Sequence, residues 1–301
     1  RSNYKGMNII TMGPPSSGGI HLIQMLKILE IYILKSFWHN NPRYVALLAE
    51  VMKFAYADRS KYLADPDYFE VPVTQLISKR YAEKIYSKIA VNEVTPSSEI
   101  LPGNLIPHES EDTTHFSIAD KFGNVTSNTY TLNSGYGSGV IIEGTGILMN
   151  NEMDDFVSAP GVPNQFGLLG GEANKIEPFK RPLSSMTPTL VFEEDEPILA
   201  TGSPGGSTII TTVLQNILNV VVHKMNIKEA VDAPRFHSQW LPDQIDYEKN
   251  SLSKRTAKKL KLLGHKLDQR GYIGEANGIM IHNGLYLGGA DRRGENTAVG
   301  Y

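Results

Sequence analysis

The chain has 301 residues, with 29 basic against 32 acidic side chains and a net charge of −3. This near balance, without any run of basic residues, favours neither nucleic acid nor an anionic membrane as a partner. The length suits one large domain or two ordinary ones with a substantial core, and the absence of cysteine excludes disulfides and thiolate metal sites.

The first ninety residues are predicted to form one strand and three helices. The strand, Met7 to Met12, ends in the glycine-rich loop 13–19. That loop lacks the glycine spacing and the lysine of a phosphate-binding loop, so we interpret it as a packed turn. The apolar run Ile20 to Trp38 is interrupted by charges, which favours a buried helix over a membrane span. Further helices are predicted at 44–63 and 81–89.

The polar stretch 92–112 contains three prolines and is predicted to be an exposed linker where the chain could be opened. A hairpin follows, with a first strand from Thr113, a turn with Gly123 in the left-handed position, and a second strand from Val125 to Asn133. A three-residue loop places Thr113 opposite Thr131, with a slip of one residue also open. Thr131 and Asn133 then share one face beside Thr113.

Thr113 is a candidate nucleophile under one condition. A threonine hydroxyl is weak unless a base lies beside it, and the free amine of an N-terminal threonine can serve as that base. A cut between Asp112 and Thr113 would supply both groups from one residue. Threonine is also common in strands, so Thr113 and Thr114 alone do not distinguish a nucleophile from ordinary strand residues.

Residues 150–156 place three carboxylates and two amides close together, with Glu152 and Asp155 among them. Two interpretations stay open, namely a solvated capping turn and a polar pocket for an amino group. Metal binding is less favoured, because no histidine lies nearby and the spacing is unlike that of a calcium loop. The loop Pro160 to Gly171 is of the kind that covers active sites.

A predicted hairpin over 190–200 leads into a glycine-rich junction at 202–207 and a helix from Thr208 to Lys224, with Ser207 as its N-cap. The junction suits an oxyanion hole of backbone N–H groups and equally suits a tight turn that needs glycine. Helices near 227–231 and 253–263 and a hairpin turning on Asn283-Gly284 complete the chain. Hairpins alternating with blocks of helices predict an α+β layered domain.

Several long motifs carry a resemblance to a known family. They are DTTHFSIADKFGNVTSNTYTLNSGYGSG (112–139), NNEMDDF (150–156), RPLSSMTPTLVF (181–192), GSPGGSTIITTVLQ (202–215), APRFHSQWLPD (233–243) and ADRRGENTAVGY (290–301). Together they resemble the small subunit of the γ-glutamyltransferases, also called glutathione hydrolases. GPPSSGG (13–19) and FAYADRSKYLADPDYFEVP (54–72) resemble the end of that family's large subunit.

The resemblance implies an N-terminal-nucleophile hydrolase with an αββα four-layer sandwich, made as a precursor that cuts itself. Residues 1–112 would be the C-terminal portion of the large-subunit region and 113–301 the small catalytic subunit, as parts of one shared domain. After the cut the two would stay together as a heterodimer that acts on γ-glutamyl compounds such as glutathione. The resemblance implies no cofactor and no metal, and a periplasmic or secreted location.

The resemblance also assigns roles to single residues. Thr113 would be the nucleophile, Thr131 would assist it, and the N–H groups of Gly205 and Gly206 would form the oxyanion hole. The γ-glutamyl group would be held by Asn133, Glu152, Asp155, Ser184 and Ser185, with the two carboxylates facing its α-ammonium and the two serines its α-carboxylate. This matching of a charged amino-acid head would exclude plain amides.

Two departures from the family pattern affect these expectations. The family's large subunit has a long N-terminal portion, including an arginine that holds the substrate α-carboxylate, and no equivalent precedes Arg1. We therefore expect a piece of the precursor whose site alone is incomplete. Phe166 stands where many bacterial relatives have a tyrosine in the covering loop. The alternatives are a related acylase or poly-γ-glutamate-cleaving enzyme on the same scaffold, or a non-catalytic fragment.

Overall fold

A computed structural model describes residues 1–100, 113–157, 162, 164–165 and 167–301. Within them, a six-stranded antiparallel sheet has the order β1-β2-β7-β8-β12-β13. A second, three-stranded sheet has the order β11-β10-β9, and β3–β4 and β5–β6 are separate hairpins. The strands are β1 (Ser2–Tyr4), β2 (Met7–Thr11), β3 (Thr114–Ala119), β4 (Val125–Tyr130), β5 (Ile141–Ile142), β6 (Ile147–Leu148), β7 (Thr189–Glu193), β8 (Glu196–Gly202), β9 (Phe236–His237), β10 (Ile245–Glu248), β11 (Leu267–Arg270), β12 (Asn277–His282) and β13 (Leu285–Gly289).

Capping side chains mark the starts of α2, α4 and α7. Asn41 accepts hydrogen bonds from two N–H groups of α2 and is followed by Pro42, while Ser78 and Ser253 cap α4 and α7 in the same way. The α-helices are α1 (Gly18–Glu30), α2 (Pro42–Tyr62), α3 (Val73–Leu76), α4 (Lys79–Tyr86), α5 (Ile209–Val221), α6 (Ile227–Asp232) and α7 (Lys254–Leu262), with short 3₁₀ turns at Leu34–Ser36, Ser97–Glu99, Glu152–Asp155, Glu172–Asn174 and Gly206–Thr208.

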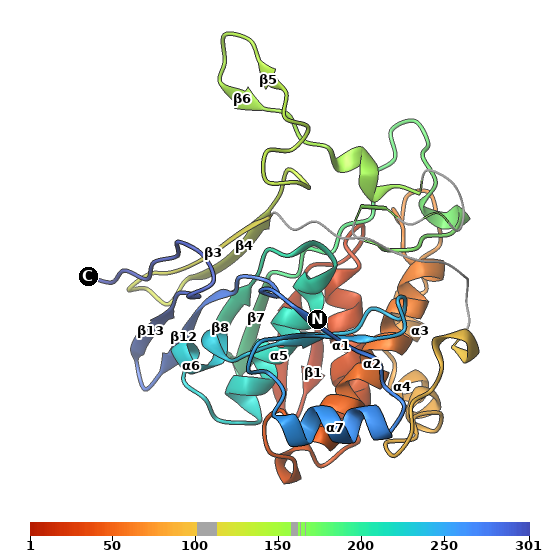
Figure 1. Cartoon of the computed structure of the whole chain (residues 1–301). Helices are drawn as coiled ribbons and strands as arrows, with labels where there is room; N and C mark the ends of the chain where they lie inside the picture. Colours follow the sequence, from red (N-terminus) through yellow and green to blue (C-terminus); the bar gives the residue numbers. More distant parts are fainter. Residues whose placement is uncertain (101–112, 158–161, 163, 166) are drawn as a thin grey trace.

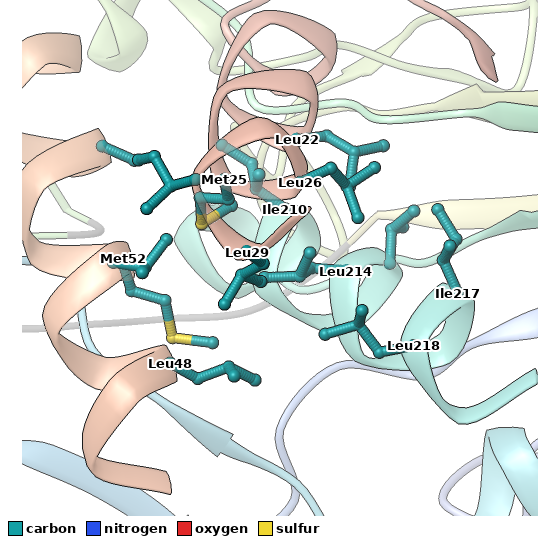
Figure 2. Close-up of a cluster of buried hydrophobic side chains, with 14 of the residues drawn as sticks. Leu22, Met25, Leu26, Leu29, Leu48, Met52, Ile210, Leu214, Ile217 and Leu218 are labelled. Atoms are coloured by element: carbon teal, nitrogen blue, oxygen red, sulfur yellow. The ribbon is translucent and has the colours of Figure 1, made fainter. Parts of the chain in front are cut away.

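The core lies between the helices and the six-stranded sheet. Leucine, isoleucine and methionine side chains from α1, α2 and α5 meet there at helical spacing, as Figure 2 shows for Leu22, Met25, Leu26, Leu29, Leu48, Met52, Ile210, Leu214, Ile217 and Leu218. The cluster therefore joins residues before position 112 to residues after 113. Among the described residues, no helix combines the length and the apolar character that a membrane crossing needs.

The β3–β4 hairpin covers the opposite face of the sheet. Residues Leu199 to Gly202 of β8 are all buried, which requires cover on both faces of this strand. Helix α5 supplies it on one face and the hairpin on the other, since Ser127 of β4 donates a hydrogen bond to the carbonyl of Thr201 at 3.0 Å. The β5–β6 hairpin instead extends away from the rest of the chain (Figure 1). Helix, sheet and hairpin thus form successive layers, which confirms the predicted α+β class.

The expected boundaries of two helices were wrong. The first helix includes Gly18 and Gly19 and ends at Glu30, after which the chain turns so that Leu34 is buried and Trp38 is exposed. Helix α5 starts at Ile209 behind a 3₁₀ turn, so Ser207 is not its cap. The described part of the expected linker is mostly exposed, as predicted, but it is anchored at Ser97, which is buried and exchanges two hydrogen bonds with Trp240. Residues 101–112 lie outside the described residues.

Candidate active site

The hairpin register brings the two predicted hydroxyls together. Thr114 pairs with Tyr130 and Ala119 with Val125, around a turn in which Gly123 has a φ of 86°. Continued by one residue, this register places Thr113 opposite Thr131, and the Thr113 hydroxyl donates to that of Thr131 at 3.3 Å. The N–H of Asn133 also donates to the Thr131 hydroxyl, at 2.8 Å. The predicted register is therefore confirmed.

A small cavity gathers most of the predicted residues. Its volume is about 20 Å³, room for about one water molecule. It is lined by Thr113, Thr131, Asn133, Asp155, Ser184, Ser185, Met186, Gly206 and Ile209. Of the predicted site residues, only Glu152 and Gly205 do not line it. Glu152 lies three residues before Asp155 in the same 3₁₀ turn, and Gly205 directly precedes Gly206.

The cavity is bordered by four loops that follow or precede regular elements. Asn133 is buried with a φ of 76°, and its amide donates to the carbonyl of Asn151 at 3.1 Å. This bond ties the end of the hairpin to the carboxylate-rich segment. The backbone of Ser184 exchanges hydrogen bonds with Pro15 and Ser17, at 3.1 and 2.8 Å, so the loop 13–19 supports the two serines.

The loop 13–19 is a packed turn, as predicted. A Cβ on Gly18 would lie 2.4 Å from the Met186 carbonyl oxygen and 2.2 Å from the Thr187 hydroxyl. Glycine is required here because the helix start approaches the backbone of residues 181–187 closely. This segment, called the serine loop below, carries Ser184 and Ser185. The loop 13–19 therefore serves to position Ser184 and Ser185.

The junction after β8 turns sharply at two glycines. Gly205 has a φ of 128° and Gly206 a φ of 49°, both in the range that favours glycine. A 3₁₀ turn begins at Gly206, and the first N–H groups of a helical segment have no acceptor within it. Because Gly206 lines the cavity beside Thr113, these donors suit a developing oxyanion. The turn geometry and the proposed donor role are compatible.

The carboxylates of the 3₁₀ turn are held in an environment that favours their neutral form. Burial, followed by the nearby charge of Glu152, raises the pKa of Asp155 to about 8. Burial also raises the pKa of Glu152. A cation placed beside this pair would reverse the effect, since it stabilises the ionised carboxylates. The capping-turn and amino-group interpretations both fit the observed turn.

His115 is the histidine nearest in sequence to Thr113, and its contacts exclude it as that residue's base. Its ring nitrogens pair with the hydroxyls of Thr129 and Ser117, at 2.8 and 3.1 Å. Burial lowers the pKa of His115 to about 4. The ring packs against Gly202, where a Cβ would lie 2.3 Å from it. His115 therefore fixes the hairpin on β8.

Arg59 is the main site residue that the sequence analysis missed. It lies near the end of α2, and its guanidinium donates to the hydroxyls of Ser17 and Ser185, at 2.9 and 3.1 Å. The signal available in the sequence was a charge on the core-facing stripe of α2, at helical spacing from Met52 and Ala55. Phe166 lies outside the described residues, and the covering loop Pro160 to Gly171 is described only in part.

Other parts of the described chain offer weaker candidates. A hollow of about 1100 Å³ lies between the starts of α2 and α7, lined among others by Arg43, Arg255 and Lys259. Of the hydroxyl groups that line it, that of Ser253 caps α7 and that of Ser36 donates to the Ile33 carbonyl. No group of three or more histidine, aspartate or glutamate side chains suited to a metal ion occurs among the described residues. Thr113 therefore stays the candidate nucleophile.

Comparisons with known proteins place the chain among relatives of one kind. The family model described as gamma-glutamyltranspeptidase matches residues 1–301. A glutathione hydrolase proenzyme of Escherichia coli (strain K12) is 48% identical over 301 residues, which cover 99% of this chain and 52% of the relative. The chain thus spans about half the length of this curated relative.

Solved structures show the same likeness. The T380A mutant of Helicobacter pylori gamma-glutamyltranspeptidase is 50% identical with a TM-score of 0.59, over 60% of this chain and 100% of that one. A cephalosporin acylase from Bacillus halodurans is 25% identical with a TM-score of 0.81, over 98% of this chain and 51% of that one.

Proposed function

The chain belongs to the gamma-glutamyltranspeptidase family, and from this we propose that the full-length protein is a self-cleaving γ-glutamyl transferase and hydrolase. Its fold is that of the N-terminal-nucleophile hydrolases, the αββα sandwich shared by its structural neighbours. The observation that carries the proposal is the hydroxyl of Thr113, 3.3 Å from that of Thr131, in a cavity that also contains Asp155, Ser185 and Gly206.

The nucleophile in this proposal is made by maturation. Hydrolysis of the peptide bond between Asp112 and Thr113 gives Thr113 a free α-amine, and Asp112 lies outside the described residues. In its neutral form this amine accepts the hydroxyl proton as Oγ1 attacks the γ-amide carbon. The N–H groups of Gly205 and Gly206 stabilise the oxyanion, and the proton passes to the leaving amine. Water or an acceptor amine then attacks the γ-glutamyl ester and restores the Thr113 hydroxyl.

The substrate head is recognised at both of its charges. Asp155 and Glu152 are proposed to pair with the α-ammonium, whose positive charge stabilises the two carboxylates in their ionised form. Ser184 and Ser185 are proposed to donate hydrogen bonds to the α-carboxylate, with Asn133 completing the site. Glutathione and related γ-glutamyl compounds carry both groups. We also propose that the two fragments remain associated after the cut, because α1, α2 and α5 contribute to one core.

An acylase on the same scaffold is the second candidate. It is supported by the TM-score of 0.81 to the cephalosporin acylase. The two activities differ in whether a free γ-glutamyl head is required. Hydrolysis of γ-glutamyl anilide together with inertness of the glutaryl analogue, which lacks the α-ammonium, would favour the transferase. Faster hydrolysis of the glutaryl analogue would favour the acylase.

The maturation step is tested with Thr113→Ala in the full-length protein. We expect this variant to stay a single chain without γ-glutamyl activity, because without the hydroxyl the bond before residue 113 is not cut and its α-amine is not freed. The wild-type protein should yield a fragment whose N-terminal sequence begins at Thr113. Thr114→Ala is the matched control, since Thr114 is exposed and should leave cleavage intact. A mature fragment that starts elsewhere would contradict the nucleophile assignment.

A further inference from the structure

Arg59 is a buried charge on an otherwise apolar face. It follows Leu48, Met52 and Ala55 along the core-facing stripe of α2, two of which appear in Figure 2. Only 4% of its surface is exposed. A guanidinium in such a place loses most of its hydration. The free-energy cost of this desolvation must be offset by directed hydrogen bonds or by an opposite charge.

The compensation comes from two serines of the candidate site. The Arg59 Nε donates to Ser17 Oγ at 2.9 Å, and Nη2 donates to Ser185 Oγ at 3.1 Å. Among the described residues no carboxylate forms an ion pair with this guanidinium. The negative charge that affects it most is Asp155, which favours its protonated form. The hydrogen-bond partners of this buried cation are thus neutral, and no ion pair neutralises its positive charge.

These contacts determine the direction in which the serines can donate. Because Ser185 Oγ accepts from Arg59, its hydrogen remains available to an acceptor in the cavity. Ser17, which also accepts from Arg59, donates its hydroxyl hydrogen to the Ser184 carbonyl at 2.8 Å and so holds the backbone of that residue. Ser184 Oγ accepts from the N–H of Met186 at 3.1 Å, which leaves its hydrogen available as well. Two neighbouring hydroxyls are therefore set as donors.

We propose that Arg59 is a positioning residue of the γ-glutamyl site, which holds Ser185 as a donor to the substrate α-carboxylate and supplies the positive charge that favours ionised Asp155. This inference rests on the proposed function. It assigns to α2 a role in recognising both charges of the substrate head. Arg59 acts on the substrate through Ser185 and through its field, not by contact with the reacting atoms.

The charges around Asp155 make the inference testable by pH. Glu152 and Asp154, on its own turn, raise the pKa of Asp155, whereas Arg59 from α2 lowers it. Asn164 donates to its carboxylate at 3.3 Å, and the Thr113 amine would face the same cavity after maturation. Since the substrate ammonium needs ionised Asp155 and the Thr113 amine acts in its neutral form, kcat/KM should rise with pH as both groups lose their protons. Loss of Arg59 should move this rise to higher pH, and loss of the Glu152 charge should move it lower.

The experiment uses the full-length matured protein with γ-glutamyl-p-nitroanilide between pH 6 and 10. Arg59→Gln should lower kcat/KM roughly 10- to 100-fold, mainly through KM, because a charge-assisted contact that orders the ground-state site is lost. Its rise of kcat/KM should lie about one pH unit above that of the wild type. Glu152→Gln should shift the rise in the opposite direction.

Two further variants separate positioning from a structural role. Arg59→Lys keeps the charge but not the fork that reaches Ser17 and Ser185 together, so the pH of the rise should stay near the wild type while KM increases. Lys61→Gln removes an exposed charge two residues along the same helix and should match the wild type. If Arg59→Gln is not cleaved to the mature form, the KM of Arg59→Lys still tests the positioning role.

The outcomes distinguish this inference from the proposed function. A wild-type protein that does not hydrolyse the γ-glutamyl anilide contradicts the function itself. An active wild type with an Arg59→Gln rise at the wild-type pH overturns the role of Arg59. The same holds if Arg59→Lys shifts the rise as far as Arg59→Gln, because charge would then not be the cause.

Discussion

At the scale of single residues, the contact between Thr113 and Thr131 follows from turn chemistry. A glycine that tolerates the left-handed conformation ends a short loop, the loop sets the register, and the register pairs two threonines. Each of these steps is local, which is why the sequence alone predicted the contact. The roles of both residues came from the family resemblance, and they remain proposals.

Arg59 was not predicted because its partners are remote. Ser17 lies 42 residues before it and Ser185 lies 126 residues after it. Helical periodicity identified α2 and its apolar face, but it carries no information on what a buried charge would meet there. A charge on a core-facing stripe indicates that some long-range partner exists and does not identify it.

Gly206 provides a test at this scale. Gly206→Ala should reduce kcat by roughly 10²- to 10³-fold with a much smaller change in KM, because a Cβ at a φ of 49° displaces the N–H that serves the transition state. Kinetics of the matured variant with a γ-glutamyl anilide, beside its melting temperature, would measure this.

A matched control separates the donor role from backbone strain. Gly284 also has a positive φ, of 74°, and lies in the exposed β12–β13 turn with open space around it. Gly284→Ala should show the strain as a lower melting temperature and keep its kcat. If Gly206→Ala lost only stability, the two glycines would be turn residues and other donors would stabilise the oxyanion.

At the scale of elements, some helix starts are marked by a capping side chain and others are set by packing alone. Asn41-Pro42 and Ser253 mark the starts of α2 and α7 in the sequence. The start of α1 has no such side-chain cap, and its two glycines are helical because tertiary contacts leave no room for a Cβ. Likewise, Ser97 looked like linker, yet its partner Trp240 lies far along the chain.

Gly18 tests the support that α1 gives to the site. Gly18→Ala should destabilise the protein by about 1–3 kcal/mol, since the new methyl group meets the backbone of the serine loop. Displacement of Ser184 and Ser185 should also raise KM for γ-glutamyl substrates. Gly13→Ala is the control in the same loop, because nothing lies within 4 Å of its added Cβ. Equal behaviour of the two variants would refute the supporting role.

At the scale of the whole molecule, ion pairs connect segments that are distant in sequence. The buried carboxylate of Asp65, just after α2, accepts from the backbone N–H of Arg181 at 2.8 Å and from its Nε at 2.9 Å. These bonds from Arg181 hold the pKa of Asp65 below its usual range. The serine loop that begins at Arg181 is thereby fixed to the end of α2.

The linkage predicts a pH effect on stability. A lowered carboxyl pKa contributes stability above the unfolded value of about 3.9, and this contribution is lost as pH falls through the folded pKa. Asp65→Asn should therefore lower the free energy of unfolding at pH 7 by about 1–2 kcal/mol. In urea titrations, the difference in the free energy of unfolding between the variant and the wild type should become smaller from pH 5 towards pH 3. A difference that is constant with pH would mean that Asp65 acts through packing alone.

The shared core has a consequence for assembly. Helices α1 and α2 precede Thr113 and α5 follows it, yet their side chains form one interior. If the chain is cut directly before Thr113 after it has folded, the two products are already packed against each other. Their one-to-one stoichiometry and the match of each to its own partner are inherited from a single translation product. Such subunits never have to find each other by diffusion, so their interface can be as apolar as the inside of a domain.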